Sequence, residues 1–464
     1  MSTNDEILGT IKNHLDTDEN TQDPIYKRVA EYISKEILSG RISNGQKLPT
    51  NRELANYLNL NITTITRSMG VLLDEKLIET SAGRGTRVAL HHQGETQFKS
   101  SPSNDPSIID LTVNRPSTDS FDYLLLETLS NISSDKRFSS IKDYQPAQGP
   151  LWARKAMTWW ARSLGVNASI NQVVLCGGAQ HALTVTLSAL FKPGDVIYTD
   201  SYTYQGLIAA CKALDIDLIG INTDHDGISI PALTKAVKEK SPSALFITSS
   251  SQNPTTATLS LATRKKIASL ADKYDFLIIE DGVYQALLDI KIEPVINLAP
   301  ERTVYISSLS KCVAPGLRAG FIVSPPNFVD DISTSLRINC WCTSTLTALV
   351  TTILIESGRA GDLVVVQREE LRARHAILNK YKGDCDIWTS GNSPHAWLLL
   401  PDSWTDIEFT KACISQGVAL LPGSEFNLNK EGYRQGVRVN LGAAVNREQL
   451  KTALEIIVSV LQSK

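Results

Sequence analysis

The stretch from Ser308 to Gly320 contains the residues best suited to covalent chemistry. Lys311 follows the hydroxyl residues Ser308 and Ser310, and Arg318 comes shortly after it. The lysine offers a primary amine that forms a Schiff base with an aldehyde when it is unprotonated, a state that burial near other positive charge favours. The two hydroxyls and the guanidinium are ligands for a phosphate group. This spacing therefore predicts a phosphorylated aldehyde on Lys311.

An acidic residue after a predicted strand suits the other side of such a molecule. The apolar run at Phe276–Ile279 predicts a buried strand, and Asp281 follows it. Pyridoxal 5′-phosphate (PLP) is a phosphorylated pyridine aldehyde, and proteins that use it pair a carboxylate with its ring nitrogen. We therefore expect PLP as cofactor, with Asp281 in that role. Tyr284 and Asn253 then suit hydrogen bonds to the phenolic oxygen of the ring.

A glycine pair provides a second group of phosphate ligands. Gly177 and Gly178 follow the predicted strand Val173–Leu175 and precede a helix. Backbone N–H groups at a helix N-terminus bind anions. The predicted phosphate ligands are therefore Gly178, Ala179, Gln180, Ser308, Ser310 and Arg318. Tyr202 and Tyr204 are both candidates for stacking on the ring.

Alternating strands and helices must position these residues. Short β-branched runs such as 196–198 and 244–247 alternate with helical stretches such as Arg264–Tyr274. Buried parallel strands have continuous apolar runs of this kind, and the helices between them are crossovers. The sequence from residue 108 onward therefore predicts an α/β sheet domain.

The first ninety residues have a different pattern. Apolar positions at Ile25, Val29, Ile33 and Ile37 recur with helical spacing. Two shorter helices follow, one after Thr50 and one capped by Asn61, and the glycine-rich segment 81–85 separates two short strands. Three helices and a hairpin predict a winged helix-turn-helix.

This segment resembles the GntR regulator domain, from ILSGRISNGQKLPTNRELANYLNLN to the wing GRGTRV. The resemblance implies binding to double-stranded operator DNA, with the third helix in the major groove. Ile62 stands where the family usually has arginine, which is the usual reader of guanine. Carried over residue by residue, the implied DNA contacts are Arg52, Thr63, Thr64, Arg67, Arg84 and Gly85.

Composition sets the domain boundaries and excludes several classes of protein. The polar stretch 91–107 is a predicted linker, so we expect a flexible N-terminus at 1–21, the winged helix at 22–90 and the large domain at 108–464. Segment 22–90 holds four Lys and six Arg against seven acidic residues, which suits DNA. Seven scattered cysteines argue against a disulfide framework and are expected to be core residues. We expect no metal, no membrane span and a cytoplasmic location.

The large domain resembles the fold-type-I, class I aminotransferases over essentially all of Ile108–Lys464. The motifs are YQPAQGPLWARKAM, LCGGAQHAL, SSQNPTTA, IIEDGVY, SLSKCVAPGLRAGF, ALLPGSEF and GVRVNLG. The resemblance implies a large sheet subdomain with a small C-terminal subdomain, Arg438 as the clamp for an amino acid's carboxylate, and Tyr204 as the stacking residue. Thr256 replaces a usual glycine, and Trp152 replaces a usual arginine.

The order of the two domains resembles the MocR subfamily of GntR regulators. This implies a homodimer with composite PLP sites that regulates transcription in response to PLP, an amino acid or an amine, through an aldimine at Lys311. Two alternatives stay open at this point. One is an active aminotransferase that carries a DNA-binding head, and the other is a repressor with an empty remnant pocket, which would be colourless.

Overall fold

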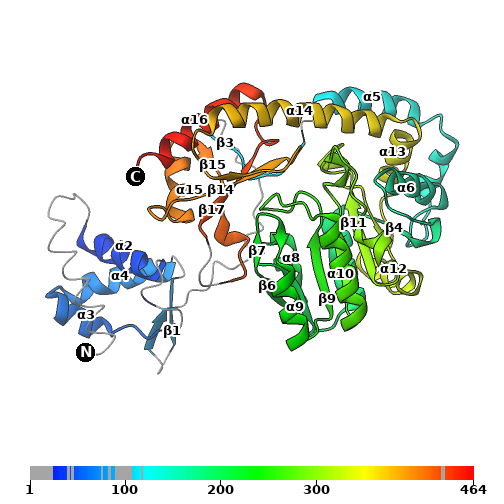
Figure 1. The fold of residues 1–464 in the computed structure, drawn as a ribbon. Coiled ribbons are helices and arrows are strands. Elements are labelled where there is room, and N and C mark those ends of the chain that lie inside the picture. The colour runs from blue at the N-terminus through cyan, green and yellow to red at the C-terminus, as the bar shows by residue number, and fades with distance from the viewer. Residues whose placement is uncertain are drawn as a thin grey trace. The chain divides into compact units, whose positions relative to one another are not determined.

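A computed structural model describes residues 24–38, 42, 46–74, 77–81, 85–88, 107–116, 119–429 and 434–464. The chain divides into two compact units, Met1–Gln97 and Phe98–Lys464. Figure 1 shows the fold of each unit. The predictions for residues 1–21, for most of the linker and for Arg84 lie outside the described residues.

The first unit is a winged helix. Its elements are α2 (Ile25–Leu38), α3 (Asn51–Leu58), α4 (Ile62–Asp74), β1 (Ile78–Ser81) and β2 (Gly85–Val88). Thr50 forms a capping box with Glu53 at the start of α3. The strands β1 and β2 pair as an antiparallel hairpin. The predicted apolar positions Val29, Ile33 and Ile37 are buried in a single core with Ile65 of α4.

Seven strands form the main sheet of the second unit, in the order β4-β12-β11-β10-β9-β5-β6. Their bounds are β4 Val173–Cys176, β5 Val196–Asp200, β6 Asp217–Ile221, β9 Ala244–Thr248, β10 Leu277–Asp281, β11 Thr303–Ser308 and β12 Gly320–Val323. One strand departs from the parallel arrangement, since β12 pairs antiparallel with β11 and β4. The chain returns from β11 to β12 through the loop of Lys311, which is too short for the helical crossover that a parallel neighbour requires.

Helices enclose this sheet on both faces. Strand residues Val174 and Ile197 pack in one apolar core with Leu183, Leu207 and Ile332 of three helices. A second and a third core lie against the other helices of the subdomain. The helix bounds are α5 Asp119–Ile132, α6 Leu151–Ser163, α7 Ala179–Leu190, α8 Gln205–Ala213, α9 Ile230–Glu239, α10 Leu261–Tyr274, α11 Val295–Leu298, α12 Val329–Cys340 and α13 Thr345–Glu356.

A smaller subdomain completes the second unit. The long helix α14 (Arg359–Tyr381) runs from the large subdomain to the small one (Figure 1). A four-stranded sheet has the order β13-β14-β17-β16, and β3 pairs with β15 beside it. The bounds are β3 Ile109–Asp110, β13 Ile387–Trp388, β14 His395–Leu399, α15 Asp406–Ser415, β15 Val418–Ala419, β16 Leu421–Pro422, β17 Gly436–Asn440 and α16 Arg447–Leu461. The short strands β7 (Thr223–Asp224) and β8 (Gly227–Ile228) pair with each other.

The cysteines differ in burial, and Cys342 and Cys385 are half-buried. Cys176, Cys211, Cys312 and Cys413 are buried, as expected of core residues. The expectation is wrong for Cys340, which is exposed at the end of α12. Within the described ranges, no group of three or more His, Cys, Asp and Glu side chains is placed to hold a metal ion. None of the described helices is both long and apolar enough to cross a membrane.

Candidate functional site

Lys311 lies in the loop between β11 and β12, with its side chain among charged residues. Its Nζ donates a hydrogen bond to the backbone oxygen of Asn114 at 2.7 Å. Burial lowers the pKa of Lys311 to about 8, helped by the positive charges of Arg438 and Arg318 and opposed by Asp281. The amine is therefore far more nucleophilic at neutral pH than an ordinary lysine.

This pKa leads to a pH-dependent rate of covalent PLP loading. A lysine with a pKa near 8 is about one-tenth neutral at pH 7, whereas an ordinary lysine is only about a few hundredths of one per cent neutral. We expect the loading rate to rise roughly tenfold from pH 6 to pH 7 and to level off above about pH 8, because only the neutral amine attacks the aldehyde. Stopped-flow absorbance measures the rate, with Nα-acetyllysine as the control. A rate that still rises tenfold per pH unit above pH 9 would contradict the lowered pKa.

Asp281 is the last residue of β10, at the carboxyl edge of the sheet. Its Oδ1 accepts a hydrogen bond from the backbone N–H of Val283 at 3.1 Å. Burial raises the pKa of Asp281 to about 7, and the Val283 N–H and the charge of Lys311 act in the opposite direction. A cationic ring nitrogen beside this carboxyl would lower its pKa again and keep it ionised. The carboxylate thus suits the predicted partner of a pyridinium.

The N-terminus of α7 lies beside Arg318, where the sequence predicts phosphate ligands. Gly178 precedes the helix with φ at 92°, and no side chain caps the helix there. A Cβ at Gly178 would lie 2.6 Å from Nη2 of Arg318, which donates to the Gly177 oxygen at 3.0 Å. Ser310 Oγ is buried and has no hydrogen-bond partner in the described part of the chain. Ser308 Oγ accepts from the Ser310 N–H at 3.4 Å. Exposed N–H groups, a guanidinium and an unpaired hydroxyl fit a phosphate group.

The two candidate stacking tyrosines point to different places. Tyr202 donates to the backbone oxygen of Arg434, and its ring packs against Trp397 of the small subdomain. Tyr204 interacts electrostatically with Asp281, and burial raises the pKa of its hydroxyl. Gln180 donates to the Gly206 oxygen at 3.0 Å, beside the Tyr204 ring. Of the two tyrosines, Tyr204 lies with the charged groups of the site.

Arg438 of β17 enters the same site from the small subdomain. Its Nη1 donates to Asn253 Oδ1 at 2.8 Å and its Nη2 to the backbone oxygen of Thr112 at 2.6 Å. The guanidinium lies over the ring of Phe426, 4.9 Å from its centroid. Burial lowers the pKa of Arg438 to about 10, so it stays cationic at neutral pH. Asn253 therefore contacts the guanidinium that is the predicted carboxylate clamp.

His395 and Asn114 also belong to the site, although sequence reasoning missed them. Asn114 Nδ2 donates to the Tyr284 hydroxyl at 2.9 Å and lies 3.1 Å from His395 Nδ1. His395 Nε2 is 3.1 Å from the Gln252 oxygen. Burial lowers the pKa of His395 to about 3, so the ring is neutral, with Nε2 as donor and Nδ1 as acceptor. No motif marked these residues, because only the fold brings segment 112–115 over the lysine loop.

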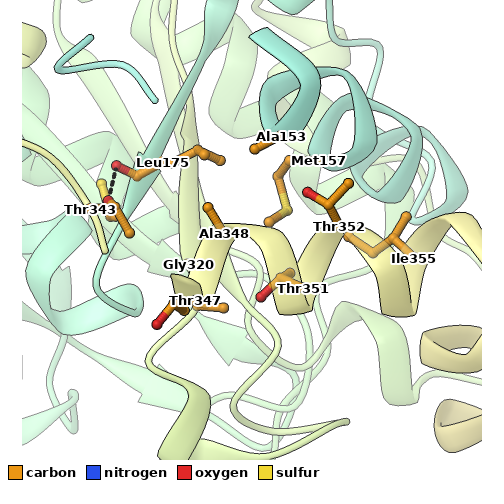
Figure 2. A pocket seen from close by; sticks show the side chains of 12 residues that line it. Ala153, Met157, Leu175, Gly320, Thr343, Thr347, Ala348, Thr351, Thr352 and Ile355 are labelled. Carbon is orange, nitrogen blue, oxygen red and sulfur yellow. Dashed lines mark hydrogen bonds between the residues drawn. The ribbon is translucent and has the colours of Figure 1, made fainter. Parts of the chain in front are cut away.

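A separate pocket lies behind the sheet and contains none of the predicted site residues. It is enclosed by α6, α13 and the strands β4 and β12, and Figure 2 shows Met157, Thr347 and Thr351 among its lining side chains. Thr343 closes one side through a 2.9 Å hydrogen bond to the Leu175 oxygen. Its volume is about 10 Å³, enough for one water molecule. It is too small for a cofactor.

Most of the predicted DNA contacts that the structure describes are exposed on the winged helix. Helix α4 buries Ile65, Met69 and Leu72, and Ser68 donates to the Tyr26 oxygen at 2.8 Å, which anchors α4 to α2. Thr63 and Arg67 are exposed on the side of α4 away from this core, and Thr64 is half-buried. Arg52 of α3 and Gly85 of β2 are also exposed. The arrangement leaves α4 accessible to a DNA groove.

Comparisons with known proteins agree with both units. Residues 106–457 match the family model described as aminotransferase class I and II, and residues 25–88 match that of bacterial regulatory proteins, gntR family. The uncharacterized HTH-type transcriptional regulator YdeF of Bacillus subtilis is 29% identical, over 96% of each chain. The similar regulator YdcR of Escherichia coli is 24% identical, over 88% of this chain and 93% of its own. A kynurenine aminotransferase from Pyrococcus horikoshii has a similar fold, with a TM-score of 0.72 and 20% identity over 84% of this chain and 98% of its own.

Proposed function

Because this chain belongs to the aminotransferase class I and II family through residues 106–457 and joins that domain to a GntR-family winged helix, we propose that it regulates transcription in response to PLP or to an amino acid or amine bound with it. The chain has the MocR architecture, and relatives that match along its length are HTH-type transcriptional regulators. Membership of the aminotransferase family implies PLP as the cofactor. The proposed domain boundaries are 22–90 and 108–464. The observation that carries the proposal is the joint placement of Lys311, Asp281 and Arg438 in one buried site.

Each residue of the site has a proposed role. When bound, PLP supplies an aldehyde that condenses with amines and a ring that withdraws electrons. Lys311 Nζ holds the cofactor covalently, and Asp281 pairs with its ring nitrogen. Tyr284 accepts a hydrogen bond from Asn114 and can donate its own hydrogen to the phenolic oxygen. Arg438 binds the carboxylate of the effector through its planar fork. The phosphate ligands are Gly178, Ala179, Gln180, Ser308, Ser310 and Arg318, with Tyr204 on the ring.

The proposed DNA contacts include one apolar side chain. Ile62 is the first residue of α4 and is 43% exposed. Residues near the start of a recognition helix contact base edges, and apolar side chains contact the methyl group of thymine. We therefore expect the operator to carry a thymine at the position that an arginine would read as guanine. The other DNA contacts are proposed to come from Arg52, Thr63, Thr64, Arg67, Arg84 and Gly85.

A homodimer is part of the proposal. Two large aromatic side chains of the second unit, Tyr144 and Trp341, are 83% and 54% exposed, and their ring centroids lie 5.4 Å apart. Trp159 and Tyr123 on neighbouring helices are also exposed. Exposed aromatic residues are typical of protein interfaces. A dimer gives two winged helices, which suits a palindromic or direct-repeat operator.

The proposed function predicts that PLP changes affinity for the operator. The operator is first found by sequencing the genomic DNA fragments that the protein binds, and a labelled fragment then reports affinity by fluorescence anisotropy. A ligand shifts a two-state equilibrium only by its differential affinity, which is typically about 5- to 150-fold between coupled sites. We expect a change of about that size on addition of PLP. The control is Arg67→Ala, which should weaken binding in both states. Equal affinities with and without PLP would refute the sensor.

An active aminotransferase is the second candidate function. The observation in its favour is the lowered pKa of Lys311, since a neutral amine at this position can take a proton from the Cα of a substrate. Asp281 and Arg438 supply the other groups that such a reaction requires. Spectra after mixing the PLP-loaded protein with single amino acids separate the two functions. Rapid conversion of the cofactor to pyridoxamine phosphate favours the enzyme, and a persistent aldimine favours the sensor.

A further inference from the structure

One short segment of backbone contacts both cations of the ligand site. We call residues Thr112–Arg115 the strap. The Thr112 oxygen accepts from Arg438 Nη2 at 2.6 Å, and the Asn114 oxygen accepts from Lys311 Nζ at 2.7 Å. The two groups that are proposed to bind the effector and the cofactor are therefore both bonded to the chain itself.

The contact with Arg438 occupies the position that a carboxylate would take. A carboxylate binds a guanidinium through two parallel hydrogen bonds. Nη1 of Arg438 is bonded to Asn253, so the edge formed by Nη2 and Nε is the one that faces a ligand. Nη2 is held by Thr112, and Nε is buried with no partner among the described residues. The strap therefore forms one of the two hydrogen bonds that a carboxylate would form with this edge of the guanidinium.

Other polar atoms near the strap are also unsatisfied. Asn440 lies two residues beyond Arg438 on β17, so the two side chains share a face of the sheet. Both amide atoms of Asn440 are buried without a partner in the described structure, as is Oδ1 of Asn114. Each buried unpaired polar group is unfavourable. The arrangement with the strap in place is thus less stable than one in which a polar ligand pairs with these atoms.

We propose that the strap is an internal competitor for the effector site, and that the α-carboxylate of a bound amino acid displaces the Thr112 oxygen from Arg438. This inference rests on the proposed function and adds how the ligand signal leaves the site. The strap follows β3 directly, and β3 is bound to β15 through the Ile109 N–H, which donates to the Gly417 oxygen at 2.7 Å. Because β3 directly precedes the strap, movement of the strap would act first on the β3–β15 pair.

Arg115 provides a way to weaken the strap without touching the ligand site. Its Nε and Nη2 donate to the Ala443 oxygen at 3.3 and 3.0 Å. Gly442 offers an independent route, because a Cβ there would lie 2.5 Å from the Arg115 oxygen and would push the strap away. Arg115→Ala and Gly442→Ala should therefore both favour the displaced strap.

The test compares two synthetic probes in the cofactor-free protein. Phosphopyridoxyl-L-alanine carries a carboxylate, and phosphopyridoxyl-ethylamine lacks one but is otherwise alike. Weakening a competing contact increases the fraction of molecules whose site is open to the ligand, and the apparent affinity rises in proportion to that fraction. We expect Arg115→Ala and Gly442→Ala to bind the alanine probe roughly three- to tenfold more tightly in calorimetry, with less than about twofold change for the ethylamine probe. Arg115→Lys, which keeps a donor, should lie between them and the unaltered protein.

Two results would overturn the inference in distinguishable ways. If both probes gain affinity equally, or if the alanine probe gains none in two folded variants, the strap does not compete with the carboxylate, and the proposed function still stands. If neither probe binds the unaltered protein, the site does not take the cofactor, and the proposed function fails together with the inference.

Discussion

Replacing Lys311 by alanine should abolish covalent attachment of PLP and the visible absorbance that accompanies it. The lysine amine, with its pKa lowered to about 8 by burial, is the proposed nucleophile, and alanine has no group that condenses with an aldehyde. Borohydride treatment followed by peptide mass spectrometry measures attachment. We expect complete modification of the Lys311 peptide in the unaltered protein and none in the variant.

The fold and the DNA affinity of this variant should match those of the PLP-free protein. Within the described residues Lys311 makes one hydrogen bond, to the Asn114 oxygen, and the proposed phosphate ligands on α7 do not depend on it. Lys265 on α10 is exposed and distant from the site's motifs, so Lys265→Ala is the matched control and should retain the full absorbance. Cofactor that remains covalently bound to Lys311→Ala would disprove the assignment.

Replacing Arg438 by glutamine should remove most of the affinity for a carboxylate-bearing ligand. Truncating one partner of a buried, hydrogen-bonded charge pair typically costs about 2–5 kcal/mol, which corresponds to roughly 30- to 5,000-fold in affinity. Glutamine keeps a donor for Asn253 but has neither the charge nor the fork. We therefore expect a loss in this range for phosphopyridoxyl-L-alanine, measured by calorimetry.

The carboxylate-free probe separates this effect from general damage. Phosphopyridoxyl-ethylamine does not use Arg438, so its affinity should change by less than about threefold, within the usual range of indirect effects. Arg372 is exposed and bonded to Asp289, and Arg372→Gln is the matched control. An equal loss for both probes would show that Arg438 supports the structure of the site rather than the ligand's carboxylate.

Much of the architecture was predictable because it depends on local pattern. Helical spacing in Ile25–Ile37 predicted α2, and a second helix was expected directly after Thr50; the structure has both. Continuous β-branched runs predicted β5, β9 and β10 to within one or two residues. These features follow from interactions between residues close in sequence, which the sequence displays directly. The GntR and aminotransferase matches confirm the two resemblances.

The tertiary structure explains one departure from the family pattern. Thr256 stands where a glycine is usual, and its φ is 67°, in the left-handed region that β-branched residues rarely adopt. Glycine adopts that region without strain. The sequence showed the substitution, whereas the backbone conformation that makes glycine favourable there is visible only in the fold.

The candidate site, too, was determined partly by the sequence and partly by the tertiary structure. The sequence by itself determined which side chains can do the chemistry, namely an amine at Lys311, a carboxylate at Asp281 and a guanidinium at Arg438, because these are properties of residue type. The tertiary structure decided that β12 runs antiparallel, that Tyr204 rather than Tyr202 lies with the site charges, and that the strap's oxygens contact Lys311 and Arg438. Backbone oxygens are alike in every residue, so no sequence pattern marks them. Their role depends on contacts between segments more than 190 residues apart, as the separations of 197 and 326 residues for these two hydrogen bonds show.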